Sequence, residues 1–255
     1  MPRPSASPLD HPDGARAHFA QFGWVLTQPL DGDELDQVRR WVDEVSAWPD
    51  DGPALQYREM TASGPRLCRS EDFVPHHDGL RELLTSGALL DTASSLLGET
   101  AVLYKEKINH KVAGGAGYAP HQDAPAYRFV ETHVSCMVAI DDADLANGCL
   151  EVVSAQHHAL LPTDERGCVR DDIVSTLTWT PAPVRAGQAL WFHSRTPHRS
   201  EPNTSTVDRR ALFPTYNALR EGDLRDAYYR QKAVEFAERG TAAVSLIGDF
   251  EGVVL

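Results

Sequence analysis

The spacing of short β-rich runs in the second part of the chain constrains its fold more than any other feature. After Gly98 come five segments rich in β-branched and aromatic residues, at positions 102–111, 133–140, 149–153, 188–192 and 210–216. Clusters of Gly, Pro, Asn and Asp separate them, as expected of connections between strands. No helical segment alternates with these strands, so a parallel β-α-β sheet is not indicated. The pattern predicts a closed or sandwiched antiparallel sheet, such as a jelly roll.

The first part of the chain is predicted to be mainly helical and to support that sheet. Apolar residues recur there at helical spacing, and Gly98 stands where a helix-ending glycine would. Asp31 and Glu34 are three positions apart, as in the capping box of a helix start. We expect helices at residues 14–22, 31–45, 79–97 and 223–239, and short strands at 24–27, 54–60 and 66–73.

The length of the chain predicts one domain. At 255 residues it can build one sizeable core, and it contains no internal repeat. We expect a single domain over residues 1–255. Its predicted parts are a loosely ordered start (1–12), a helical support (13–98), a jelly-roll core (99–220), and a C-terminal helix and tail (221–255).

Charge and composition exclude several classes of partner. The formal net charge is -13 and the pI is about 5.2, which argues against nucleic acid because a phosphate backbone binds basic surfaces. No segment is long and apolar enough to span a membrane, and the N-terminus lacks the apolar stretch of a signal peptide. We therefore expect a cytoplasmic protein that binds a small molecule, without a membrane partner. The sequence carries no signature of an oligomeric state.

Three residues have the composition of a metal site: His121 and Asp123 in Pro-His-Gln-Asp, and the distant His198 in Thr-Pro-His-Arg-Ser. One carboxylate and two imidazoles form the facial triad that binds non-haem Fe(II) and leaves coordination positions open. Residues i and i+2 of an extended segment point to the same side, so His121 and Asp123 can share one ion. His198 would arrive from another strand. His193 is the alternative third ligand, and otherwise a group that supports the site from outside.

Two further residues stand at fixed distances from His198: Ser200 at plus two and Arg209 at plus eleven. A guanidinium can hold a terminal carboxylate through two parallel hydrogen bonds, and a hydroxyl can support the same oxygens. A site for 2-oxoglutarate requires this combination. Arg210 would point to the opposite face of a strand, and side-chain alternation alone does not choose between the two arginines.

In these segments the chain resembles the phytanoyl-CoA dioxygenase family of Fe(II)/2-oxoglutarate oxygenases. The resemblance covers roughly residues 103–217. The matching stretches are Lys105-Glu-Lys-Ile-Asn109, Pro120-His-Gln-Asp123, Asn147-Gly-Cys-Leu150 and Trp191 through Arg209. One departure is visible after the third stretch: the family often has Pro-Gly-Ser-His there, and this chain has Ser154-Ala-Gln-His157.

The resemblance implies a double-stranded β-helix, a cupin-like jelly roll, supported by N-terminal helices. It implies an enzyme that uses Fe(II), O2 and 2-oxoglutarate as co-substrate, with His121, Asp123 and His198 as metal ligands and catalytic residues. Halogenating relatives replace the metal carboxylate with a small residue. The retained Asp123 therefore favours hydroxylation or an oxidative ring closure.

The resemblance also assigns the co-substrate contacts. The family spacing selects Arg209 rather than Arg210, together with Ser200. Asn109 and Lys107 belong to a basic-Ile-Asn stretch, whose Asn contacts the co-substrate in related oxygenases. Both are therefore predicted to bind 2-oxoglutarate.

The predicted substrate is a small hydrophilic metabolite that carries amino groups, such as an antibiotic biosynthesis intermediate, oxidised at a C–H bond. The acidic excess and the lack of long apolar runs beside the metal motifs favour it. Its ammonium groups could meet acidic residues such as Glu131, Asp171, Asp172 and Glu201. An aminoalkylphosphonate is the alternative substrate, since inward-facing Lys105 and Lys107 would favour phosphonate or carboxylate. An alternative from another class is a non-catalytic cupin-like metal-binding module or a zinc hydrolase. Neither of these two functions would explain the presence of Arg209 and Ser200.

Overall fold

Two antiparallel sheets face each other in the computed structural model, which describes residues 7–9, 11–127, 129–131, 133–239 and 250–255. The strands are β1 (Trp24–Thr27), β2 (Leu55–Thr61), β3 (Gly64–Glu71), β4 (Ala101–Lys105), β5 (Lys107–Lys111), β6 (Tyr118–His121), β7 (His133–Ala139), β8 (Leu150–Val152), β9 (Thr180–Ala182), β10 (Ala189–His193), β11 (His198–Ser200), β12 (Arg209–Leu212) and β13 (Thr215–Ala218). The larger sheet has the order β1-β10-β7-β12-β5-β3-β2, and β13 pairs with both β7 and β4. The smaller sheet has the order β6-β11-β8-β9. This arrangement confirms the predicted jelly roll.

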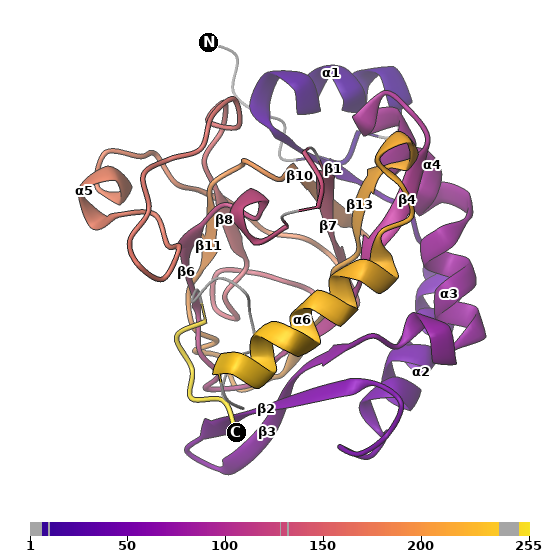
Figure 1. Cartoon of the computed structure of the whole chain (residues 1–255), viewed down its shortest axis with the longest axis vertical. Coiled ribbons are helices and arrows are strands. Elements are labelled where there is room, and N and C mark those ends of the chain that lie inside the picture. Colours follow the sequence, from indigo (N-terminus) through magenta and orange to yellow (C-terminus); the bar gives the residue numbers. More distant parts are fainter. Residues whose placement is uncertain (1–6, 10, 128, 132, 240–249) are drawn as a thin grey trace.

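Helices α1 to α4 pack on the outer face of the larger sheet. The helices are α1 (Pro12–Phe22), α2 (Gly32–Ser46), α3 (Asp78–Thr85), α4 (Gly87–Leu97), the short α5 (Asp171–Val174) and α6 (Arg225–Arg239). Figure 1 shows α2, α3 and α4 along one side of the molecule, and the strands of the smaller sheet on the other side. The C-terminal helix α6 packs against β4.

The alternation of side chains on β7 divides the core into two layers. Cys136 and Val138 point outward and pack among the apolar side chains of α2 and α4. Met137 and Ala139 point inward and pack against Leu150 and its neighbours in the smaller sheet. Both faces of the strand are therefore buried, which explains its almost continuous apolar sequence.

Two segments predicted as single strands are each divided in two. The segment 102–111 becomes β4 and β5, separated by Glu106, whose buried side chain turns away to accept hydrogen bonds from Arg225 and from the backbone N–H of Val74. The segment 210–216 becomes β12 and β13, separated at Pro214, which has no N–H to donate to a sheet. The two breaks lie side by side, because Lys107 and Phe213 exchange backbone hydrogen bonds next to them.

The predicted helix over residues 79–97 is wrong as one element, because it breaks at Ser86 into α3 and α4. The extended conformation of Ser86 lets each helix turn its own apolar side to the core. Two predicted helix ends are confirmed. Asp31 and Glu34 form the capping box that starts α2, and Gly98 ends α4 with a φ of +76°.

The turn after β8 contains a residue other than glycine, Ala155, in the left-handed conformation. Ala155 has a φ of +59°, in a region that side-chain-bearing residues rarely adopt. Its N–H donates to the carbonyl of Phe22 at 2.9 Å, which ties this turn to the end of α1. At the departure Ser154–His157 this chain therefore forms a turn with a left-handed residue.

The expected loose order of residues 1–12 falls largely on residues 1–6 and 10, outside the described part of the chain. Within the described residues, Pro12 already begins α1. No helix in the described part of the chain combines the length and apolar character needed to cross a bilayer.

Candidate active site

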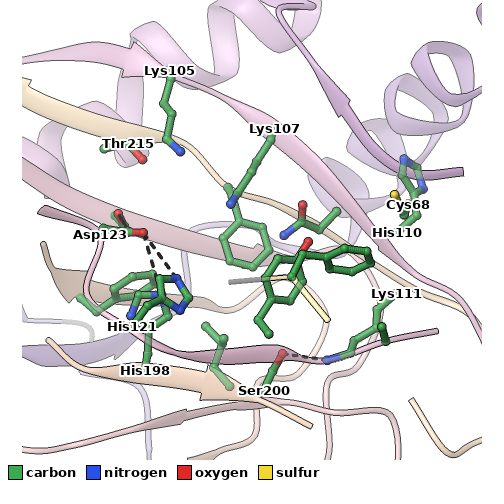
Figure 2. Close-up of a pocket in the computed structure, with 18 of the residues that line it drawn as sticks. Cys68, Lys105, Lys107, His110, Lys111, His121, Asp123, His198, Ser200 and Thr215 are labelled. Carbon is green, nitrogen blue, oxygen red and sulfur yellow. Dashed lines mark hydrogen bonds and ion pairs between the residues drawn. The ribbon is translucent and has the colours of Figure 1, made fainter. Parts of the chain in front are cut away.

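The predicted metal ligands meet between the two sheets. His121 ends β6 and His198 begins β11, and the register of these antiparallel strands pairs the two residues directly. Their ring centroids lie 4.2 Å apart. Asp123 Oδ1 lies 3.8 Å from His121 Nε2 and 4.0 Å from His198 Nε2, and Figure 2 shows the three side chains gathered together. Ligand atoms this close together can hold one metal ion.

Backbone carbonyls fix the orientation of both imidazoles. His121 Nδ1 lies 2.8 Å from the carbonyl of Ala119, and His198 Nδ1 lies 3.0 Å from that of Thr196. A carbonyl oxygen only accepts, so each Nδ1 carries the proton and donates it. Each Nε2 is then the unprotonated atom that a metal requires. The geometry and chemistry of the two rings therefore fit a divalent ion.

The carboxylate of Asp123 is held by a strand of the larger sheet. Its Oδ2 accepts a hydrogen bond from Ser135 Oγ of β7 at 2.5 Å, which leaves Oδ1 facing the imidazoles. Burial alone would raise the pKa of Asp123, but its interactions with the nearby His198 imidazole and the Lys105 ammonium group outweigh burial and lower that pKa. The carboxylate is thus ionised and suited to Fe(II).

His193 lies outside this cluster. It ends β10, and its Nδ1 accepts a hydrogen bond from the backbone N–H of Arg195 at 3.0 Å. Its ring lies near Phe19 and His157, with centroid distances of 6.2 and 5.4 Å. It is not among the described residues that line the pocket, so the structure brings His198, and not His193, to Asp123.

Alternate residues of β4 and β5 line the active-site pocket beside this cluster. Lys105, Lys107, Asn109 and Lys111 share the inward face, and Figure 2 shows the three lysines pointing into the same space. Side-chain alternation along the predicted strand 102–111 places the first three on one face, and Lys111 is the next residue in that series. The same two-residue period would have found it.

Arg209 and Lys111 lie together at the end of the pocket away from Asp123. Arg209 Nη2 donates to the carbonyl of Gly148 at 2.8 Å, and Lys111 Nζ lies 3.3 Å from the same oxygen. Lys111 Nζ also donates to Ser200 Oγ at 2.7 Å. Burial, and then the neighbouring Arg209, lower the pKa of Lys111 to about 7. Two cations and a hydroxyl thus form one anion-binding end.

The Asn-Gly-Cys-Leu motif has a structural role at this end of the pocket. Gly148 has a φ of +71°, and a side chain there would collide with the carbonyl of Glu201 and with Lys111. Glycine is therefore needed for the carbonyl of residue 148 to reach both cations. Asn147 fixes the turn, because its side chain bonds the backbone of Asp144 and Asp142.

A buried network behind the pocket wall holds Asn109. Arg69 Nε donates to Asn109 Oδ1 at 3.1 Å, and Arg69 Nη2 donates to the hydroxyl of Tyr118 at 2.8 Å. Glu71 pairs with Arg69 and also with Lys232 of α6. Since the amide oxygen of Asn109 receives the guanidinium, its NH2 group is the one left to face a ligand. Arg69 was not among the predicted site residues, and its only signal is its register opposite Asn109.

The acidic residues considered for an amine substrate lie elsewhere. Glu131, Asp171, Asp172 and Glu201 are exposed and do not belong to the described pocket lining. The carboxylates that do line the pocket are those of Asp123 and Glu59.

A jelly roll with a buried His-Asp-His cluster defines the class of Fe(II)/2-oxoglutarate-type oxygenases, and structural comparison agrees. The fold is similar to that of EctD from S. alaskensis with 2-oxoglutarate and 5-hydroxyectoine, with a TM-score of 0.72 and 17% identity over 86% of this chain and 82% of that one. It is also similar to the epimerase SnoN in complex with Fe3+, alpha ketoglutarate and nogalamycin RO, with a TM-score of 0.70 and 21% identity over 81% and 83%. At these identities the likeness concerns the fold.

Sequence comparison identifies the family. The model of the phytanoyl-CoA dioxygenase (PhyH) family matches residues 19–211, and the chain belongs to this family of dioxygenases. It is 46% identical to a methylphosphonate hydroxylase of Gimesia maris, over 94% of this chain and 95% of the relative. It is 38% identical to a 2-aminoethylphosphonate dioxygenase of an uncultured bacterium, over 87% of each. The predicted family and enzyme class are therefore confirmed.

Proposed function

We propose that this dioxygenase uses Fe(II) and 2-oxoglutarate to hydroxylate a carbon atom of a small phosphonate. The observation that carries the proposal is the charge of the pocket, which is lined by Lys105, Lys107, Lys111 and Arg209. One terminal carboxylate of 2-oxoglutarate does not require four cations, so a second anionic ligand is indicated. The two relatives described above act on phosphonates, as their names state.

The residues present fit the metal. His121, Asp123 and His198 would hold Fe(II), which would supply the activation of O2 coupled to the decarboxylation of 2-oxoglutarate. The protein keeps both Nε2 atoms and Oδ1 directed at one point through Ala119, Thr196 and Ser135. Hydrogen-bond partners of this kind keep metal ligands in position in the absence of the metal.

The co-substrate would lie between the metal cluster and the anion-binding end. Arg209 would hold its far carboxylate, with Ser200 and the newly identified Lys111 as further donors. Asn109, oriented by Arg69, would donate its NH2 group to the co-substrate. Lys107 lies between the two ends of the pocket and keeps its predicted co-substrate contact.

The phosphonate proposal replaces an amino-bearing antibiotic intermediate as the favoured substrate. That expectation rested mainly on the acidic excess of the chain, and the exposed acidic residues that could have met ammonium groups are not part of the described pocket lining. The alternative prediction was an aminoalkylphosphonate, and its phosphonate group agrees with the inward lysines and with the names of the relatives. Retained Asp123 favours hydroxylation or an oxidative ring closure, and the name of the Gimesia maris relative supports hydroxylation.

The reaction can be tested directly. With methylphosphonate, the proposed reaction converts the substrate, O2 and 2-oxoglutarate into hydroxymethylphosphonate, succinate and CO2. We expect a new 31P resonance and one succinate for each phosphonate consumed. Amino sugars, acyl-CoA and free amino acids serve as comparison substrates. Succinate release stimulated by one of these, and by no phosphonate, would refute the proposed substrate class.

A further inference from the structure

We propose that Lys105 and Thr215 form the binding site for the phosphonate group, and that this site selects phosphonates without an amine. The inference rests on the proposed function, and it adds which residues hold the substrate and which substrates are excluded. From the sequence, Lys105 was considered only as one of two inward-facing lysines, and Thr215 was not among the predicted site residues.

Strand register places Lys105 and Thr215 next to the metal cluster. Thr215 of β13 is the direct partner of Lys105 in β4 and of Ser135 in β7. Side chains directly opposite on adjacent antiparallel strands lie about 4.5–5.5 Å apart at Cβ. All three line the pocket, and Ser135 Oγ holds Asp123. The row Lys105–Thr215–Ser135 therefore leads across three strands to a proposed metal ligand.

The ammonium group of Lys105 is held in position by aromatic rings. Lys105 is 6% exposed, and its Nζ lies 4.3 Å from the ring centre of Tyr127 and 5.8 Å from that of Tyr228. Glu106 points to the other side of the strand, so it does not compete for this space. Figure 2 shows the ends of Lys105 and Thr215 on the same side of the pocket as Asp123. The cation is thus pre-positioned in a largely desolvated place, where a charged hydrogen bond is strong.

The chemistry of the pair matches a phosphonate group. A lysine ammonium offers three donors and a threonine hydroxyl offers one, while a phosphonate presents three acceptor oxygens. The opposite end of the pocket already has Arg209, Lys111 and Ser200 for a carboxylate. A phosphonate at Lys105 and Thr215 would place its attached carbon close to the metal, because Thr215 is the direct strand partner of Ser135, which holds Asp123. The two anions would then occupy separate ends.

The same place disfavours an ammonium group. Among the described pocket residues, the two carboxylates are committed elsewhere: Asp123 to the metal cluster, and Glu59 to the backbone N–H of Ala116 at 3.1 Å. Glu59 is electrostatically coupled to Lys111, at the other end of the pocket. An aminoalkylphosphonate would bring its ammonium group among lysines without a counter-charge, and a buried unpaired charge is costly.

Binding measurements separate the two ends of the pocket. We would titrate methylphosphonate into the anaerobic Fe(II) and 2-oxoglutarate complex by calorimetry, for the wild type, Lys105→Met, Thr215→Val and Thr215→Ser. Loss of a hydrogen bond to a charged group should raise the Kd for methylphosphonate about 10- to 100-fold in Lys105→Met. Thr215→Val should raise it about tenfold, and Thr215→Ser, which keeps the hydroxyl, should restore most of the affinity. The Kd for 2-oxoglutarate should change much less in all three variants.

Substrate comparison in the wild type tests the selectivity without any variant. We expect methylphosphonate and ethylphosphonate to be oxidised with a kcat/KM at least about tenfold above that of 2-aminoethylphosphonate. Equal values for the amine-bearing substrate would overturn the selectivity and leave the proposed function intact. Unchanged methylphosphonate binding in both Lys105→Met and Thr215→Val, or weakened 2-oxoglutarate binding instead, would overturn the assignment of the site. Absence of turnover with every phosphonate would instead refute the proposed function.

Discussion

Arg209 and Arg210 are adjacent in β12, yet their guanidinium groups lie on opposite faces of the larger sheet. Arg209 is 4% exposed and donates to the carbonyl of Gly148 inside the pocket. The guanidinium of Arg210 forms two hydrogen bonds to Asp141 and a further one to Asp43 of α2. The alternation of a strand separates the two side chains, and the register with β5 decides which of them faces the pocket. The structure thus brings Arg209, and not Arg210, to Ser200 and Lys111.

Replacement of Arg209 by Lys should weaken 2-oxoglutarate binding. Lysine keeps the charge but cannot form two parallel hydrogen bonds, so we expect the KM for 2-oxoglutarate to rise about 10- to 100-fold. The matched control is Arg210→Lys, which should lower the melting temperature slightly and leave that KM nearly unchanged. Steady-state kinetics with varied 2-oxoglutarate measure both. Similar KM values for the two variants would contradict the assignment.

Alanine variants of His121, Asp123 and His198 should lose iron. Removal of one of three ligands leaves a site that cannot hold the ion against a chelator. We expect stoichiometric iron in the wild type after anaerobic loading and desalting, and only traces in these variants, measured by elemental analysis. His193→Ala should retain its iron, because the residue lies outside the cluster. Iron loss in His193→Ala with retention in His198→Ala would show that the third ligand is wrong.

The affinity for 2-oxoglutarate should depend on pH through Lys111. Its pKa is lowered to about 7 by burial and by Arg209, from an ordinary value of 10.5. Below pH 7 the ammonium group is charged and can attract the carboxylate, and above pH 7 the unliganded protein loses this charge. We therefore expect the Kd for 2-oxoglutarate to rise as the pH increases from about 7 to 9. Calorimetry should show a weaker dependence in Lys111→Met, and equal slopes would contradict the role of Lys111.

The same shift has a consequence for stability. The unfolded chain keeps Lys111 protonated up to its ordinary pKa, whereas the folded chain favours the neutral form. The lowered pKa of Lys111 therefore reduces the free energy of unfolding by its full amount below pH 7. This destabilisation declines as the pH rises toward 10.5. Lys111→Met should stabilise the ligand-free protein most at low pH, as measured by denaturant unfolding.

Arg69 should act on catalysis only through the residues it positions. In Arg69→Lys a single ammonium group replaces the guanidinium, which donates to both Asn109 and Tyr118. We therefore expect a several-fold higher KM for 2-oxoglutarate and a smaller effect on kcat. The control is Arg66→Lys, on the same strand, where an exposed pair with Asp208 should matter little. A fall in kcat alone, with KM unchanged, would contradict the positioning role.

Ala155→Gly should stabilise the protein. Glycine adopts the φ of +59° without the steric cost that alanine incurs, so the gain is about 1 kcal/mol, reduced somewhat by the greater freedom of the unfolded chain. For a chain of this length this gain corresponds to a rise in Tm of about 2–4 °C. Calorimetry would show it, and Gly148→Ala, at a φ of +71° and with no room for a side chain, should show the opposite sign. A lower Tm in Ala155→Gly would contradict this account of the turn.

The sequence by itself determined the fold class, the family and the three residues of the candidate metal cluster. These follow from local patterns: the two-residue alternation of strands, the His-x-Asp spacing, and the fixed distances from His198 to Ser200 and Arg209. Alternation also placed Lys105, Lys107 and Asn109 on one face, as the structure shows. Such patterns survive in the sequence because each depends on residues only a few positions apart.

Only the tertiary structure decided which distant residues share the pocket. The row Lys105–Thr215–Ser135 and the meeting of Lys111 with Ser200 depend on register between strands far apart in the chain. The break of residues 79–97 at Ser86 likewise follows from packing against the sheet. A one-residue change of register would turn every side chain of a strand to its other face, and nothing local in the sequence fixes that choice.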